Sequence, residues 1–430
     1  MMKYLSLVNE LIHKYKEKHE DQYLNLALDH FYLWYETEYP KKTKINTISQ
    51  NLKVISNLLV LCKNEGLHLL DEVFMQVLCA YCLILHREKT EVSHCLSLIY
   101  ASIIYNSYYI NHAFDEYIDE AFKFLKSNNN FITPNLKKTY ELYLELRSFN
   151  EFINNYPNYH RVKTYISGKI TELTEFLFAF LYPDGFISLG KEMIKLNNSD
   201  ELNTYNTTKK LFIYPEIISY HNGDYRFTYQ YYYRNLNKYY DNLGLTIYYH
   251  KMFLILPNEE RSIITIDDHN YLHDTSQLNK VKILNVVEEN GSVFIKSINK
   301  LYPETTILTN ILCRDKQVFL IFTFESEYTQ KYGINFYLNP KLSLNKTESS
   351  VTGYFLYEKL ISLKVVYCTK EVSLKTNNNY ITYEVIGSNL IVILNISIGD
   401  VKDEVKVIPN DQKLRLLINK EKLYVINKRS

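Results

Sequence analysis

The amino-acid sequence predicts a chain of the α+β multidomain class, with a helical N-terminal half followed by an antiparallel β half. Apolar residues recur at helical spacing up to about residue 200, and from about Phe212 they alternate with a period of two. The change of period falls in the polar stretch 194–210, which we interpret as a linker. A chain of 430 residues is also too long for one ordinary hydrophobic core. We therefore predict two domains, at residues 1–200 and 201–430.

The first half contains several amphipathic runs that are separated by polar breaks. Apolar side chains recur every three or four residues in 48–59, in 96–103 and in 166–181. Segments such as EYPKKTK and SNNNFITPN interrupt this pattern. We expect helices joined by short loops, with neighbouring helices packed antiparallel. The periodicity leaves open whether these helices close into a ring.

The second half consists of short runs with strand character. They include SVFIKSIN, QVFLIFTFES, LISLKVVYC, YITYEVIG and NLIVILNISI, which are rich in β-branched and aromatic residues. Asn290-Gly291 and Gly387-Ser388-Asn389 are hairpin signals between several of the strand-like runs. No helical pattern interrupts the runs, so we expect an antiparallel sheet.

The composition is that of a globular protein without a strongly charged surface. Hydrophobic residues make up 46% and charged residues 23%, and 49 Lys plus Arg against 48 Asp plus Glu give a formal charge of +1. This balance argues against a large nucleic-acid-binding surface. No uncharged apolar run reaches the roughly 18 residues of a spanning helix. The N-terminus lacks an apolar signal core and the six cysteines are scattered, so we predict a cytoplasmic protein without a transmembrane segment.

Two stretches carry residue types that bind metals. Cys79 and Cys82 form a CxxC inside an apolar run of helical character, and no second pair of ligands accompanies it, so we interpret them as buried helix residues. The stretch 267–274, DDHNYLHD, places His269 and His273 at a spacing that suits a helix, whereas the region has the pattern of strands and loops. A metal site there is the alternative, and we predict neither a metal nor another cofactor.

Two polar positions in the helical half are candidates for catalysis. Ser93 and His94 stand at an expected helix start, where His94 could act as a catalytic imidazole or neutralise a charge. The alternative is that Ser93 caps the helix and His94 is partly buried. Tyr140 follows a loop and could exchange a proton as a general acid or base. Its helical spacing from Leu136 and Tyr143 equally indicates core packing.

Two further stretches lie near the change from helices to strands. Pro183-Asp184-Gly185 has the composition of a turn that ends a helix. In NKYYDNLGLTIYYHK, residues 237–251, a strand with one buried face follows Asp241 and a group of tyrosines. Asp241 could order a neighbouring ring or accept backbone hydrogen bonds, or it could be a solvated residue at a strand start.

The order of these motifs along residues 85–340 resembles that of the heparinase II/III-like and alginate-lyase-like polysaccharide lyases. SHCLSLIYASIIY is similar to a helix that carries an Asn-His pair in the family, with Ser93 at the Asn position and His94 retained. NNNFITPNLKKTYELYLEL is similar to the family's loop and Tyr-His pair, with Tyr140 retained and Glu141 at the His position.

Three motifs continue the resemblance toward the C-terminus. FLFAFLYPDGFISLGKE retains the family's Pro-Asp-Gly turn, with Lys191 at the position of an Asp. NKYYDNLGLTIYYHK is similar to a His-x-His-x-Asp motif that opens a strand, with Asn237 and Tyr239 at the His positions and Asp241 retained. RDKQVFLIFTFES is similar to a strand that begins with an arginine, here Arg314. The resemblance implies an N-terminal incomplete (α/α) toroid and a C-terminal antiparallel β-sandwich.

The resemblance also implies a chemistry, which is β-elimination in a uronic-acid polymer. Such lyases neutralise the uronate carboxylate with Asn and His so that the C5 proton becomes acidic, and a Tyr or His then removes that proton. The expected catalytic residues are Tyr140, His94 and Tyr239. The expected substrate-binding residues are Ser93, Asn237, Asp241 and Arg314.

The leading prediction is a lyase-like protein that acts on or binds an acidic bacterial polysaccharide, in capsule or exopolysaccharide biosynthesis inside the cell. Its partners would be the acidic polysaccharide or oligosaccharide and capsule-biosynthesis proteins. The alternative is a catalytically inactive relative that binds glycan or scaffolds polysaccharide assembly, because family His and Asn positions are substituted. Hydrolysis in the same cleft would need a pair of facing carboxylates, which the sequence does not show.

Overall fold

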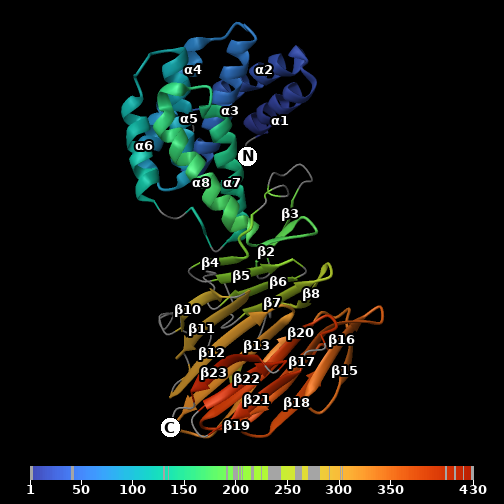
Figure 1. The fold of residues 1–430 in the computed structure, drawn as a ribbon. Coiled ribbons are helices and arrows are strands. Elements are labelled where there is room, and N and C mark those ends of the chain that lie inside the picture. Colours follow the sequence, from blue (N-terminus) through green and yellow to red (C-terminus); the bar gives the residue numbers. More distant parts are fainter. Residues whose placement is uncertain are drawn as a thin grey trace. The chain divides into compact units, whose positions relative to one another are not determined.

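The structure is a computed structural model, and it divides into two compact units (Figure 1). It describes residues 3–39, 43–128, 131–133, 135–189, 192–196, 202, 205, 207–214, 217–223, 225–230, 244–256, 264–269, 281–289, 291–300, 302, 304–401, 404–410, 413–419 and 421–427. The helical unit comprises Met1–Thr133 and Lys137–Glu175, and the β unit comprises Pro134–Leu136 and Phe176–Ser430.

The helical unit is built from eight α-helices and one short 3-10 helix, counted over the described residues. They are α1 (Lys3–Lys18), α2 (Asp21–Thr37), α3 (Ile45–Asn64), α4 (Asp71–Glu88), α5 (Val92–Tyr108), α6 (Asp115–Ser127), α7 (Leu136–Ile153), η1 (Pro157–Tyr159) and α8 (His160–Phe178). Helix α5 is apolar around most of its circumference, and its residues 94–99 and 101–106 are buried. Such a helix needs neighbours on several sides, and α3, α4 and α6 all contact α5.

Helices α3, α5 and α7 lie side by side and run in the same direction. Near the start of α5, Ser93 donates a hydrogen bond to Glu145 of α7. Two turns later the ring of Tyr100 packs on that of Phe152, with the ring centroids 4.0 Å apart. Contacts between α3 and α5 follow the same order along both helices. Helices α4 and α6 contact each other and α5 from a second layer. The helical unit is therefore an incomplete (α/α) toroid.

The β unit is an antiparallel β-sandwich. Its described strands are β1 (Leu181–Tyr182), β2 (Phe186–Leu189), β3 (Glu192–Lys195), β4 (Leu211–Tyr214), β5 (Ile217–Asn222), β6 (Tyr225–Gln230), β7 (Gly244–Tyr249), β8 (Met252–Ile255), β9 (Ile264–Ile266), β10 (Val281–Glu289), β11 (Ser292–Asn299), β12 (Thr305–Arg314), β13 (Gln317–Ser326), β14 (Gln330–Tyr337), β15 (Ser343–Lys346), β16 (Ser350–Phe355), β17 (Glu358–Cys368), β18 (Val372–Asn377), β19 (Tyr380–Gly387), β20 (Leu390–Ile398), β21 (Val405–Pro409), β22 (Lys413–Ile418) and β23 (Glu421–Asn427). The sheet orders are β1-β2-β3, β4-β5-β6-β7-β8, β10-β11-β12-β13-β20-β17-β16-β15, β18-β19-β14-β9 and β21-β22-β23.

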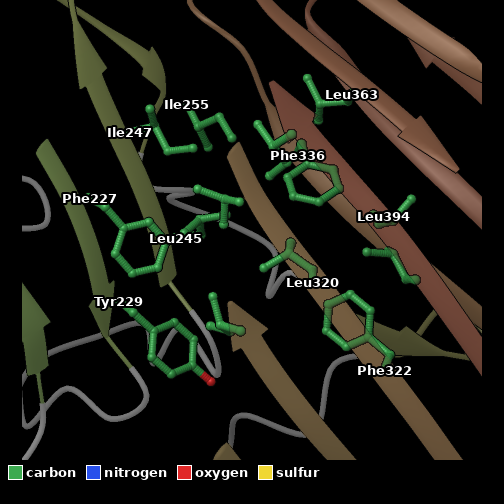
Figure 2. Packing of buried hydrophobic residues seen from close by; sticks show 14 of the residues in the cluster. Phe227, Tyr229, Leu245, Ile247, Ile255, Leu320, Phe322, Phe336, Leu363 and Leu394 are labelled. Carbon is green, nitrogen blue, oxygen red and sulfur yellow. The ribbon is translucent and has the colours of Figure 1, made fainter. Parts of the chain in front are cut away.

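The main core of the β unit lies between the five-stranded sheet and the eight- and four-stranded sheets (Figure 2). The five-stranded sheet contributes Phe227, Tyr229, Leu245, Ile247 and Ile255. Facing them are Leu320, Phe322, Phe336, Leu363 and Leu394. Burying one such side chain contributes about 1.5–3 kcal/mol, so this cluster is a principal source of stability for the unit.

Strands β13 and β20 of the eight-stranded sheet are buried on both faces. Leu320 and Phe322 enter the main core, whereas Phe319 and Ile321 pack on the opposite face, against β22. This double burial explains why QVFLIFTFES and NLIVILNISI are continuous apolar runs and do not alternate.

The predicted fold class is confirmed, with two differences of detail. The compact units divide at Glu175–Phe176, whereas the sequence placed the end of the helical domain at residue 200, because β1 to β3 already belong to the β unit. The Asn290-Gly291 signal does join a hairpin, β10–β11. The predicted hairpin at Gly387-Ser388-Asn389 is wrong, because β19 pairs with β14 and β18 while β20 pairs with β13 and β17.

In the part of the chain that the structure describes, no helix combines the length and apolarity needed to cross a membrane.

Replacing Ile247 by alanine tests the core between the sheets. Ile247 is fully buried, so the truncation leaves a cavity and lowers the free energy of unfolding by roughly 2–5 kcal/mol. The matched variant Ile213→Ala, at a side chain that is 53% exposed on β4, costs about 1 kcal/mol or less. Urea titrations of both variants measure the difference, and equal losses would contradict this assignment of the core.

Candidate functional site

His94 is buried near the start of α5 with a protein partner on each ring nitrogen. The backbone N–H of Thr90 donates to Nδ1 at 3.3 Å, and Nε2 lies 2.7 Å from Oδ1 of Asn46. Because Nδ1 accepts a hydrogen bond, the proton of the neutral ring sits on Nε2 and is donated to Asn46. Burial lowers the pKa of His94 below its ordinary value. The ring is therefore a neutral link between α3 and α5, and a substrate group has to displace one of its partners to reach it.

Ser93 takes part in a charged group that joins three helices. Its hydroxyl donates to Oε2 of Glu145 at 2.7 Å, and Lys53 of α3 forms an ion pair with Oε1 of the same carboxylate. The prediction that Ser93 caps the helix is wrong, because α5 begins at Val92 and Glu91 occupies the capping position. The hydroxyl is thereby available to a side-chain partner on α7.

A cavity of about 750 Å³ lies beside the Lys53–Glu145 pair, between α1, α3, α5 and α7. His13, Lys16 and Lys53 bring basic groups to its wall, and Glu145 and Glu151 bring carboxylates. Its aromatic surface comes from Tyr100, Phe149 and Phe152. The two lysines and two carboxylates balance, so the cavity is polar and aromatic without a large excess of positive charge.

Tyr140 lies on α7, one turn before this cavity. Its ring is half-buried and stacks on the buried Tyr143 with the ring centroids 6.2 Å apart. On a helix, Tyr140 shares a stripe with Leu144 and Glu151, which both line the cavity. The structure therefore places Tyr140 at the edge of the cavity-facing surface of α7.

The remaining predicted site residues belong to the β unit. Asn237, Tyr239 and Asp241 lie outside the described residues. Arg314 is the last residue of β12, opposite Gln317 at the tip of the β12–β13 hairpin, and its Nε is 3.7 Å from Oδ2 of Asp315. The hairpin tip thus holds the guanidinium beside a carboxylate of the next residue.

The Pro-Asp-Gly turn makes a specific contact with the strand predicted from NKYYDNLGLTIYYHK. Gly185 has a φ of 72°, which favours glycine, and closes the turn between β1 and β2. The hydroxyl of Tyr248 on β7 donates to Oδ2 of Asp184 at 2.7 Å. Burial and the neighbouring Asp184 raise the pKa of Tyr248 above its ordinary value, so the phenol stays protonated and keeps donating. Two motifs that are distant in sequence therefore meet in the fold.

The segment that carries this turn covers the outer face of the five-stranded sheet. The carbonyl of Ala179 accepts hydrogen bonds from Ser219 Oγ at 2.6 Å and from Nε2 of His221 at 2.9 Å. Burial, with the charge of Arg226 as a second cause, lowers the pKa of His221 to about 3. His221 is thus a neutral donor that ties the segment to the sheet.

The stretch 267–274 does not form a metal site within the described residues. The backbone N–H of Lys331 donates to Asp267 Oδ1 at 2.9 Å, and the Lys331 ammonium pairs with Asp268. His273 lies outside the described residues, and no cluster of three or more metal-binding side chains occurs among those that the structure describes.

Several residues of these groups were not predicted from sequence. Asn46, Lys53 and Glu145 lie on three different helices, and Tyr248 lies far along the chain from Asp184. Each of them has an ordinary local pattern, such as a charged residue on an amphipathic helix. Only the packing of the helices and sheets brings them together, and no local signal could have found them.

Neither a protein-family model nor a curated protein matches this sequence. Solved structures do. The heparan sulfate lyase HepC from Pedobacter heparinus matches with a TM-score of 0.73 at 10% identity, over 99% of this chain and 82% of that one. The fold is that of heparinase III. A structure of heparinase III itself matches with a TM-score of 0.67 at 11% identity, over 97% of this chain and 81% of that one.

The structure of a viral enzyme is also similar to this chain. The chondroitin lyase ODV-E66, a baculovirus envelope protein, matches with a TM-score of 0.56 at 9% identity, over 96% of this chain and 80% of that one. At such identities the comparison establishes the heparinase III-like fold, and the chemistry has to be argued from the residues of this chain.

Because His221 is buried as a neutral ring, we predict that the free energy of unfolding falls in acid. In the unfolded chain its pKa is about 6.5, so below that pH the unfolded state binds a proton that the folded state does not. The free energy of unfolding therefore falls by up to about 1.4 kcal/mol per pH unit between pH 6.5 and pH 3. His221→Gln removes the titrating group and should flatten this dependence when unfolding is measured between pH 7 and pH 4.

Ser219→Ala is the matched control for that experiment. It also removes a hydrogen bond to the carbonyl of Ala179 but carries no titrating group. It should lower stability by a similar amount at every pH. A pH dependence that is unchanged in His221→Gln would contradict the neutral buried ring.

Proposed function

We propose that this protein binds an acidic polysaccharide that contains uronic acid, and that it cleaves the polymer by β-elimination with Tyr140 as the proton-transferring residue. The observation that carries the proposal is the heparinase III-like fold over nearly the whole chain, since lyases named for heparan sulfate and chondroitin share it. The cavity of the helical unit supports it at the level of residues, because it combines ammonium groups with aromatic rings.

The proposed recognition works by exchange of partners at Lys53. In the free protein the Lys53 ammonium is paired with Glu145. A uronate carboxylate in the cavity would compete for the same ammonium, while Ser93 keeps its hydrogen bond to Glu145. Pairing the uronate with a cation makes its C5 proton more acidic, which is the electrostatic requirement of the reaction.

The proposed elimination needs one base and one acid. The base takes the C5 proton, a double bond forms between C4 and C5, and the C4–O bond breaks while its oxygen receives a proton. Tyr140 can supply that proton from the edge of the cavity face of α7. Tyr239 is the proposed second proton-transfer residue, and Asn237, Asp241 and Arg314 are proposed substrate contacts in the β unit.

A second candidate function is glycan binding without cleavage. The arrangement of His94 favours it, because both ring nitrogens are engaged and the ring is almost fully buried. Ser93 is likewise engaged with Glu145. Loss of a neutralising group or of a base costs on the order of 10² to 10⁴ in rate, so a chain without both retains little lyase activity.

The place of this activity in the cell is part of the proposal. We assign the polymer to bacterial capsule or exopolysaccharide production in the cytoplasm, with capsule-biosynthesis proteins as partners. The neighbouring genes test this assignment directly, because capsule genes on both sides support it and their absence speaks against it.

An assay of Tyr140→Phe separates cleavage from binding. Purified protein is incubated with heparan sulfate, chondroitin and alginate, and the ultraviolet absorbance of the unsaturated product is followed. The lyase proposal predicts product formation that falls by at least about 100-fold in Tyr140→Phe. Tyr328→Phe, at an exposed ring of the β unit, is the matched control and should leave the rate unchanged. Polymer binding without product would favour the second function, and neither binding nor product would overturn both.

Two substitutions at the ion pair should change polymer affinity in opposite directions. Glu145→Gln releases Lys53 from its partner, so it should tighten binding of an acidic polymer by about 2- to 5-fold. Lys53→Gln removes the cation and should weaken binding by a similar factor, with a smaller dependence on salt. Affinities from titration calorimetry at two salt concentrations measure this, and changes of the same sign would contradict the exchange.

A further inference from the structure

Arg226 lies under the Pro-Asp-Gly turn on the outer face of the five-stranded sheet. Along β6, Tyr225 and Phe227 point into the main core, so Arg226 between them points to the opposite face. The register places Arg226 beside His221 on β5 and beside Tyr248 on β7. The segment that begins after α8 covers this face of the sheet, which removes part of the guanidinium from water.

The guanidinium has no partner for its charge among the residues that the structure describes. Its Nε is buried without a hydrogen-bond acceptor, and no carboxylate of a described residue forms an ion pair with it. His221 beside it is a neutral ring whose Nε2–H is donated to Ala179. The carboxylate of Asp184 accepts a hydrogen bond from the hydroxyl of Tyr248. Taking a cation out of water without pairing it is costly, so a partly buried guanidinium that no described residue pairs with calls for an explanation.

A cavity of about 450 Å³ opens at this guanidinium. We call it the Arg226 pocket, and its wall is formed by Phe178, Leu181, Tyr182, the Pro183–Gly185 turn and Arg226. Tyr182 is buried, and burial raises its pKa to about 12, so its hydroxyl stays neutral. The pocket is within the size range of small-molecule sites and presents one cation, one carboxylate and two ring faces.

We propose that the Arg226 pocket binds the carboxylate or sulfate group of one acidic sugar residue. The planar guanidinium offers two parallel N–H donors to such an oxyanion, and the bond is strengthened because the site is partly removed from water. Asp184 at the rim accepts a hydrogen bond from a hydroxyl of the same sugar. Its negative charge also disfavours doubly charged groups, so the pocket selects a singly charged oxyanion.

This inference rests on the proposed function for the identity of the ligand as a sugar, whereas the oxyanion chemistry rests on the pocket alone. It assigns the β unit its own contact with the acidic polymer, apart from the cavity of the helical unit. The Pro-Asp-Gly turn then has a role beyond ending a helix, because it forms the roof of a binding site and orients Asp184 into it.

Titration of the full-length protein with single sugars tests the proposal. Glucuronate, glucose 6-sulfate, inorganic sulfate and uncharged glucose are the probes, followed by calorimetry and by the shift in thermal unfolding. Glucuronate or glucose 6-sulfate should bind with 1:1 stoichiometry, and glucose should not. Arg226→Gln should weaken that binding by at least about tenfold, because a hydrogen-bonded charged partner is lost. Arg226→Lys keeps the charge but loses the two parallel N–H donors, and it should retain part of the affinity.

Three controls make the outcome decisive. Lys364→Gln, at an exposed lysine of β17, should bind glucuronate like the parent, and an equal loss there would mean nonspecific attraction and overturn the proposal. Arg226→Met should be at least as stable as the parent in the absence of ligand and should lose the ligand-induced shift. A strongly destabilised Arg226→Met would make the arginine a structural residue and would also overturn the proposal. Absence of binding by the acidic sugars and by sulfate in the parent would do the same.

The result is separable from the proposed function. Single-sugar binding that depends on Arg226, in a protein that neither binds nor cleaves any polymer, supports the pocket and removes the polysaccharide assignment. Polymer binding that is unchanged in Arg226→Gln, together with no single-sugar binding, supports the proposed function and removes the pocket. Binding of inorganic sulfate alone, which is doubly charged, would show neither selectivity for a sugar nor selectivity for a single charge and would overturn the proposal.

Discussion

The β unit depends on burying its five-stranded sheet on both faces. Inward side chains such as Phe227 and Ile247 enter the main core, and the outward face is covered by the segment that carries the Pro-Asp-Gly turn. Because side chains alternate along a strand, Arg226 and Tyr248 point toward this covered outer face. There they form a polar layer that is only partly exposed to solvent. The chemistry of that layer follows from its burial. His221 stays neutral, and no residue that the structure describes pairs with the charge of Arg226.

The helical unit uses its candidate catalytic residues to hold helices together. His94 links α3 to α5, and Ser93 links α5 to α7 through Glu145. A group that is hydrogen-bonded in the free protein has to break that bond before it meets a substrate, at a net cost of about 0.5–3 kcal/mol. The same contacts therefore stabilise the toroid and restrain the chemistry that the resemblance assigns to them. Tyr140 lies one turn before the cavity on α7, where its ring stacks on Tyr143.

The likeness to heparan sulfate lyases at about 10% identity has a physical explanation. A fold requires hydrophobic periodicity, suitable turns and a filled core, and many sequences meet these conditions. Gly185 illustrates a position that the backbone itself constrains, because its positive φ favours glycine whatever the site contains. A catalytic group has no such tolerance, since its identity and placement both matter. A shared fold therefore does not by itself establish a shared site.

The sequence by itself determined the class of each half, the antiparallel strand pairing and the positions of several long strands, because periodicity and turn residues act locally. It also marked Ser93, His94, Tyr140 and the Pro-Asp-Gly turn as positions of interest. The tertiary structure alone decided that Ser93 bonds to Glu145 and that Gly387 precedes a change of sheet. It also brought Tyr248 to Asp184 and placed Arg226 in the wall of a pocket. These outcomes depend on which distant segments pack together, and no local pattern of residues specifies that.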